Sequence, residues 1–221
     1  METAPRARPA AVSAYDYVRD PDEIYRRSFA TIRAEADLAA VPADIEPLLV
    51  RMIHAAGDPA VVADVAWTEG AAAAGRRALA AGAPILVDAA MVASGVIRAR
   101  LPAANAVLCT LGEPGIAEAA QAAGTTRSAA AVDRWRERLE GAVVAIGNAP
   151  TALFRLLELL DDGAPKPALI LGFPVGFVGA AESKEALVAH PGGVPYVTLR
   201  GRRGGSAFAA AAVNALAGSA R

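Results

Sequence analysis

The chain has 221 residues, a formal net charge of −1 and 54% hydrophobic residues. A chain of this length buries about 70–75% of the surface that its unfolded form exposes, so it can form a hydrophobic core without disulfides or a structural metal. The near-neutral charge provides no global basic field that would attract nucleic acid. The single cysteine, Cys109, excludes an internal disulfide and a cysteine-cluster metal site.

The N-terminal segment, residues 1–14, has no apolar signal-peptide core and predicts a flexible leader before one domain at 15–221. The longest uncharged stretch, 167–181, is interrupted by glycines and Pro174 and is too short to span a bilayer. The sequence therefore predicts a cytoplasmic protein with no membrane partner.

The first predicted helix starts at Asp20, a capping residue followed by Pro21 at the first helical position. Behind it, Ile24, Ser28 and Ile32 recur at helical spacing. Ser28 therefore shares the face of an expected buried stripe. A small packing residue that bonds its own backbone is the plain interpretation of Ser28.

A second helix is predicted from Asp44 to Ala56, and Gly57 suits its C-cap. His54, one of two histidines in the chain, lies in the last turn. The helix dipole favours a cation there, by about 0.3–1 kcal/mol at an exposed position. Because histidine titrates near neutrality, this position suits proton transfer, although a lone histidine is more often an ordinary surface or core residue.

From residue 70 onward, alanine-rich helices alternate with short apolar strands. This pattern predicts an α/β fold, with a mostly parallel sheet flanked by helices on both faces and an N-terminal helical segment. The predicted strands end at Asp88, Leu111, Asn148, Phe173 and Arg200. Because such sheets bind ligands beyond the carboxyl ends of their strands, the site is expected at these ends.

Several segments near these strand ends have the chemistry to hold an anion. Residues 126–128 open a helix, a glycine-rich loop follows Phe173, and an arginine-glycine loop follows Arg200. Backbone N–H groups in such loops can hold an anion, although each loop alone also fits a capped turn. The nucleotide-binding fingerprints and the G-x-S-x-G elbow are absent, and the two histidines lie too far apart for a metal-ligand pair.

Segments in order along nearly the whole chain resemble the precorrin-8X methylmutase family, the precorrin isomerases of corrin-ring (vitamin B12) biosynthesis. They include YDYVRDPDEIYRRSFATIRAEAD, RMIHAAGDP, GAPILVDAAMVASGV, TRSAAA, VVAIGNAPTALF and GRRGGSAFAAAAVNAL, and the most specific is GFPVGFVGAAESK. The resemblance implies a homodimeric isomerase without a cofactor or metal. Its substrate would be the tetrapyrrole precorrin-8X, whose methyl group moves from C-11 to C-12 to give hydrogenobyrinic acid.

The resemblance places the histidine of the family on His54, as proton donor and acceptor in a 1,5-sigmatropic shift assisted by protonation. It also places two substrate contacts of the family on Ser28 and Arg127. We expect four further residues to contact the substrate: Thr126, Ser128, Asn148 and Lys184. His190 lies in no motif and is expected to be a solvated loop residue.

The substrate carries acetate and propionate carboxylates. Arg127 could bind a carboxylate through two parallel hydrogen bonds, and Lys184 could bind one through the compact charge of its ammonium group. Its flat ring needs apolar walls, for which the candidates are Met91, Val92, Phe173 and Phe177. The alternative function is a non-catalytic tetrapyrrole carrier, which would keep the carboxylate contacts but would not need His54. The motifs leave open whether the substrate carries cobalt.

Overall fold

The computed structural model describes residues 15–190 and 192–218, so the predicted leader, 1–14, lies outside the described residues. The described part contains a six-stranded sheet in the order β1-β6-β5-β4-β2-β3. β1 pairs antiparallel with β6, and every other pairing is parallel. The predicted α/β class with a mostly parallel sheet is therefore confirmed. The strands are β1 (Val65–Trp67), β2 (Ile85–Val87), β3 (Val107–Leu108), β4 (Val143–Ile146), β5 (Leu169–Gly172) and β6 (Tyr196–Leu199).

The five strands expected from the sequence are present, although β3 ends at Leu108 rather than Leu111. β1 is an addition that the sequence pattern did not predict. It has three residues and directly follows the 3₁₀ helix η1 (Pro59–Asp64), so it is too short to show strand periodicity.

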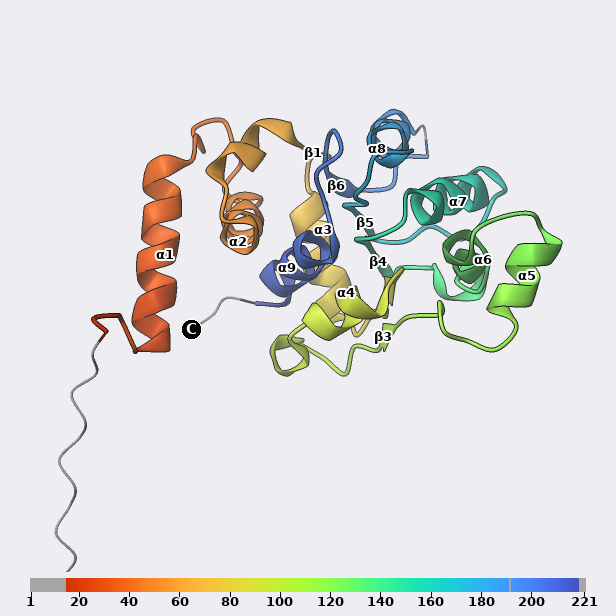
Figure 1. The fold of residues 1–221 in the computed structure, drawn as a ribbon, viewed down its shortest axis with the longest axis horizontal. Coiled ribbons are helices and arrows are strands. Elements are labelled where there is room, and N and C mark those ends of the chain that lie inside the picture. The colour runs from red at the N-terminus through yellow and green to blue at the C-terminus, as the bar shows by residue number, and fades with distance from the viewer. Residues whose placement is uncertain (1–14, 191, 219–221) are drawn as a thin grey trace, which may run out of the picture.

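Helices cover both faces of the sheet (Figure 1). Helices α2, α3, α4 and α9 pack on one face, and α6, α7 and α8 pack on the other, with α5 against α6. The helices are α1 (Pro21–Glu35), α2 (Glu46–Ala56), α3 (Ala71–Ala80), α4 (Ala90–Gly95), α5 (Ile116–Ala122), α6 (Arg127–Asp133), α7 (Pro150–Asp161), α8 (Ala180–Ala189) and α9 (Ser206–Ala217).

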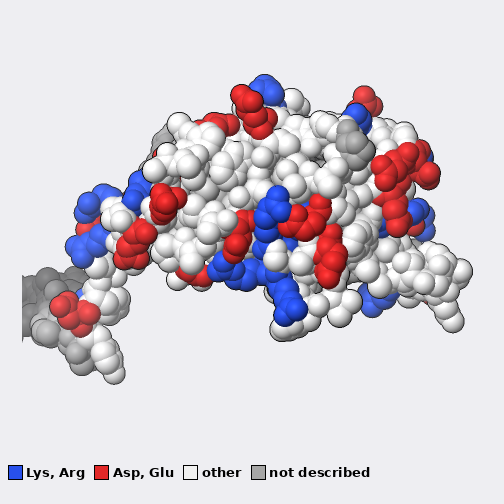
Figure 2. Space-filling model, turned by 90° about the horizontal axis from the view of Figure 1, so that it is seen from above, with Lys and Arg blue, Asp and Glu red and all other residues white. Residues whose placement is uncertain are grey.

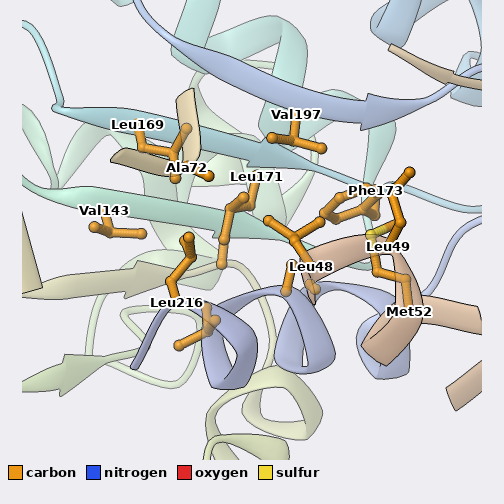
Figure 3. Packing of buried hydrophobic residues seen from close by; sticks show 14 of the residues in the cluster. Leu48, Leu49, Met52, Ala72, Val143, Leu169, Leu171, Phe173, Val197 and Leu216 are labelled. Atoms are coloured by element: carbon orange, nitrogen blue, oxygen red, sulfur yellow. The ribbon is translucent and has the colours of Figure 1, made fainter. Parts of the chain in front are cut away.

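The core is divided between the two faces because successive side chains of a strand point in opposite directions. In β4, Val143 packs in one cluster and Val144 in the other. Figure 3 shows the first cluster, to which α2 contributes Leu48, Leu49 and Met52. These three side chains are fully buried, and each contributes about 1.5–3 kcal/mol of hydrophobic stabilisation. The helix that carries His54 is therefore firmly anchored to the sheet.

Helix α1 starts as predicted, with the carboxylate of Asp20 accepting a hydrogen bond from the N–H of Asp22 at 3.0 Å. The expected buried stripe is wrong in part, since Ile32 is buried while Ile24 is 44% exposed. The reason is that α1 packs mainly against α2 at one end of the molecule (Figure 1). One apolar flank of α1 is thus left open.

No helix in the described ranges is long and apolar enough to cross a membrane. The single domain over 15–221 and the cytoplasmic location stay predictions.

Candidate functional site

His54 is exposed in the last turn of α2, which ends at Gly57 in the left-handed conformation (φ 66°) that glycine adopts readily. Its Nδ1 lies 2.7 Å from Oγ of Ser28 on α1. The rings of Tyr25 and Phe29 flank the imidazole, with centroids 5.4 and 5.5 Å away. Within the described part of the chain, Nε2 has no hydrogen-bond partner, so it is the nitrogen that can face a ligand.

The pKa of His54 is lowered from its ordinary value. Partial burial beside the aromatic rings disfavours the imidazolium, and the positive charge of Arg51 disfavours it further. The helix dipole, which favours a cation at this position, acts in the opposite direction. The lowered pKa makes the imidazolium a stronger acid, and the neutral imidazole a weaker base, than those of an ordinary histidine.

A hollow of about 260 Å³ lies beside the imidazole and is lined by both helices and the turn after α2. Its lining includes Ser28, Ile32, His54 and Pro59. Ligand pockets usually measure about 300–1,000 Å³, so a large ligand would extend beyond this hollow.

A second group of predicted residues lies at the N-termini of α6 and α7. Thr126 caps α6, since its Oγ1 accepts a hydrogen bond from the N–H of Ala129 at 3.1 Å. The same oxygen lies 2.8 Å from Oγ1 of Thr151, which brings the start of α7 beside the start of α6. Sequence reasoning missed Thr151, although its position directly after Pro150 marked the start of a helix.

Arg127 is the first residue of α6 and is exposed. Its guanidinium makes no hydrogen bond or ion pair with the residues that the structure describes. Ser128 is half-buried behind it, and the side chain of Asn148 is exposed between β4 and α7. Arg127 and Asn148 thus present polar groups to solvent that the fold itself does not use.

Asp88 explains the conformation of the turn that carries Asn148. Its carboxylate is 2% exposed and accepts three backbone hydrogen bonds, from Gly147 (2.8 Å), Asn148 (2.9 Å) and Ala149 (2.7 Å). Burial raises the pKa of Asp88, and the three N–H donors oppose that rise. β2 lies between β3 and β4, so Asp88 sits where the order of the strands reverses, at the topological switch point.

Lys184 is fully buried in α8, and burial lowers its pKa to about 8. Its Nζ donates to the carbonyl of Pro174 at 3.1 Å and to that of Arg203 at 2.6 Å. The structure thus places Lys184 inside the protein rather than on a surface that a ligand reaches. There it ties the loop after β5 to the loop after β6.

Arg203 continues this connection toward His54. Its Nη1 donates to Oδ2 of Asp58 at 2.7 Å, and its Nη2 pairs with Asp64. Asp58 also caps η1, which follows the turn after His54. The face in Figure 2 shows Lys and Arg side chains lying among Asp and Glu side chains. The sequence alone did not predict this network.

Of the candidate apolar walls, Met91 is 74% exposed and Phe177 is 84% exposed. The expectation is wrong for Val92 and Phe173, which are fully buried in the core between sheet and helices. The guanidinium of Arg202 lies 5.6 Å from the centroid of the Phe177 ring. Exposed apolar side chains therefore do lie in the first turn of α4 and in the loop after β5.

The expectation that His190 is solvated is also wrong. Its side chain is 9% exposed, and its Nε2 lies 3.1 Å from Oδ1 of Asp161. Its Nδ1 accepts a hydrogen bond from the N–H of Gly192 at 3.2 Å, so the imidazole holds the loop after α8. In the described ranges, no group of three or more His, Cys, Asp or Glu residues is placed to hold a metal ion.

The predicted site residues thus form two separate groups. Ser28 and His54 belong to α1 and α2 at one side of the molecule, whereas Arg127 belongs to α6 at the other side (Figure 1). One copy of the chain does not bring these side chains together.

Comparison with known proteins identifies close relatives. Residues 23–219 match the protein family described as Precorrin-8X methylmutase. A protein of that name from Pseudomonas aeruginosa is 70% identical over 202 residues, covering 91% of this chain and 97% of the relative. Another of that name, from Sinorhizobium sp, is 60% identical over 203 residues, covering 92% and 97%. The crystal structure of precorrin-8x methyl mutase from Thermus thermophilus matches with a TM-score of 0.81 and 42% identity, covering 89% of this chain and 94% of that one.

Proposed function

The chain belongs to the precorrin-8X methylmutase family, isomerases of cobalamin biosynthesis, and we propose that it moves a methyl group from C-11 to C-12 of precorrin-8X, giving hydrogenobyrinic acid. The relatives are named as mutases, which favours an isomerase over the alternative of a tetrapyrrole carrier. The proposed chemistry rests on the environment of His54, whose exposed imidazole is hydrogen-bonded through Nδ1 to Ser28 and flanked by two aromatic rings.

In this proposal, Nε2 of the His54 imidazolium donates a proton to the macrocycle, which assists the migration of the methyl group. An isomerisation neither gains nor loses atoms, so the same nitrogen takes a proton back after the shift. The lowered pKa of His54 suits the first step, because it makes the imidazolium a stronger acid, and in the second step the neutral ring takes up the proton that the rearranged macrocycle releases. Ser28 keeps the ring oriented between the two steps.

We also propose that a homodimer completes the site. The hollow beside His54 is small, the flank of α1 around Ile24 is open, and Arg127, at the opposite side of the chain, has no partner among the described residues. In a two-fold dimer, each copy contributes the same surface patch to the interface. When that patch includes both α6 and the hollow, α6 of one copy lies over the hollow of the other. Arg127 of the second copy would then hold a substrate carboxylate with its two-pronged guanidinium.

The substrate is proposed to be metal-free, because both of the close relatives described above are named for precorrin-8X without cobalt. Thr126, Ser128 and Asn148 are proposed to contact it beside Arg127, and Met91 and Phe177 to pack on its ring. For Lys184, the proposed role is to position the loops that meet the substrate.

The test is to add metal-free precorrin-8X to the purified protein and follow the visible spectrum, which changes when the methyl shift alters the conjugated system. Conversion by the wild-type protein is expected, with slower conversion of the cobalt-containing analogue. Binding of the substrate without any spectral conversion would instead support the carrier function.

A further inference from the structure

A second cavity, of about 500 Å³, lies between α1, α2, α3 and α9. The charged side chains of its lining are three arginines: Arg33, Arg51 and Arg76. Arg33 donates to Oε1 of Glu46 at 2.7 Å, and Arg76 donates to the carbonyl of Asp44 at 2.8 Å. Arg51 donates to no acceptor among the described residues.

Arg51 is 8% exposed, and the contact of its guanidinium is the Phe29 ring, whose centroid lies 5.7 Å from Cζ. Burial lowers the pKa of Arg51, and the positive charge of Arg100 lowers it further. Buried charged side chains are normally paired with an opposite charge, because removing them from water is costly. Arg51 therefore lacks the anion that its position calls for.

Arg100 also has a buried donor without an acceptor among the described residues. It lies in the 3₁₀ helix η2 (Arg98–Arg100), and its Nη1 is buried without a hydrogen-bond partner. Buried donors are almost always satisfied in folded proteins, so this nitrogen marks a missing acceptor. The positive charge of Arg100 acts on Arg51, and two guanidinium groups whose like charges interact favour an anion that both can bind.

Arg51 lies next to the imidazole of His54. Arg51 precedes His54 by one turn of α2, and the ring of Phe29 contacts both of them. The charge of Arg51 also acts on the pKa of His54. A carboxylate held at Arg51 would therefore belong to a molecule whose body reaches the imidazole.

We propose that Arg51 and Arg100 form a binding site for one acetate or propionate carboxylate of the tetrapyrrole, which sets the position of the ring relative to His54. This inference rests on the proposed function, since it identifies the carboxylate as one of the substrate. The pair is separate from Arg127, which would act from the second copy.

The experiment measures the dissociation constant of hydrogenobyrinic acid for the full-length wild type and for the variants Arg51→Met and Arg100→Met. Methionine keeps the length of the side chain and removes its charge. Arg98→Met is the matched control, because Arg98 is exposed in the same 3₁₀ helix. Loss of a charge-assisted hydrogen bond weakens binding by about ten- to a hundredfold, so each variant is expected to lose at least about tenfold and the control less than about twofold.

A second ligand shows whether a carboxylate is recognised. For the product with all carboxyl groups converted to methyl esters, wild type and Arg100→Met are expected to bind equally well. Equal losses for acid and ester, or an unchanged affinity for the acid in both arginine variants, would overturn the proposal.

A third measurement is the melting temperature of each protein without ligand. Replacing an unpaired buried charge by an apolar side chain of similar size is often stabilising, so Arg100→Met is expected to melt at or above the wild-type temperature. A lower melting temperature together with wild-type affinity would mean a purely structural arginine. If the wild type itself does not bind the acid, the proposed function fails and the identity of this ligand fails with it.

Discussion

The hydroxyl of Ser28 and the imidazole of His54 meet at 2.7 Å although the two residues are 26 positions apart in the chain. This bond joins α1 to the end of α2 and fixes which ring nitrogen faces outward. It also places the outward-facing nitrogen where two helices meet rather than at a strand end.

Replacing Ser28 by Ala is expected to lower the single-turnover rate by about two- to tenfold, the usual effect of losing one hydrogen bond. Substrate affinity should change little, because the hydroxyl mainly orients His54. The measurement is the rate of the spectral change at saturating substrate. Ser28→Thr keeps the hydroxyl and should recover most of the rate, and equal losses in both variants would contradict an orienting role.

Replacing His54 by Ala is expected to leave the fold and tetrapyrrole binding nearly intact and to remove turnover. Loss of a positioned acid or base typically slows a reaction by about 10²–10⁴. The measurement pairs the single-turnover rate with the dissociation constant of the product. A variant that converts substrate at close to the wild-type rate would refute proton transfer by His54.

The pKa of His54 gives a third prediction, and the charge of Arg51 sets the direction of the expected change. The pKa of His54 lies below its ordinary value, with burial as the main cause and Arg51 as the second. Arg51→Met removes a positive charge that disfavours the imidazolium, so the pKa should rise, and the protonated fraction at a given pH should rise with it. Titration of the imidazole signals by NMR measures this, and Arg98→Met should leave the pKa unchanged.

A fourth prediction tests whether two copies share one site. His54→Ala and Arg127→Ala are each expected to be slow as homodimers, Arg127→Ala through weaker substrate binding. If Arg127 acts from the second copy, a mixed dimer has one site with both residues intact. An equimolar mixture, after subunit exchange, should recover about a quarter of the wild-type activity. No recovery in verified mixed dimers would mean that each site uses residues of one copy.

Local sequence patterns predicted much of this fold, because they depend on neighbouring residues. The cap at Asp20, the glycine at Gly57 and the buried strand β4 all follow from the sequence within a few positions. β1 could not be predicted, since three residues carry no period and its pairing with β6 bridges Val65 and Leu199.

The candidate site was predictable to a smaller extent. The resemblance indicated Ser28 and His54 before the structure placed them together. The burial of Lys184, and the lack of an acceptor for Arg51 among the described residues, could not be predicted, because both depend on packing between segments distant in the sequence. The separation of Arg127 from His54 concerns the arrangement of whole elements, about which sequence spacing says nothing.

Asp88 gives a fifth prediction, on stability. An asparagine keeps the shape of the side chain but replaces one acceptor oxygen by a donor, so at least one of the three N–H groups loses its partner. A buried donor without an acceptor costs about 1–3 kcal/mol. Asp88→Asn should lower the free energy of unfolding by at least this amount in denaturant titration. An unchanged midpoint of the denaturant-induced unfolding would contradict this prediction.

The hydrogen bonds of Asp88 also bear on which ligands this scaffold can accept. In doubly wound α/β proteins that bind nucleotides, free amide groups at the strand reversal receive a phosphate. Here the chain supplies its own anion, so Gly147, Asn148 and Ala149 have no amide left to offer. A phosphate approaching the same place would meet the negative charge of a carboxylate. A ligand at this edge of the sheet therefore has to bind through the surrounding loops rather than through the three amides at the strand reversal.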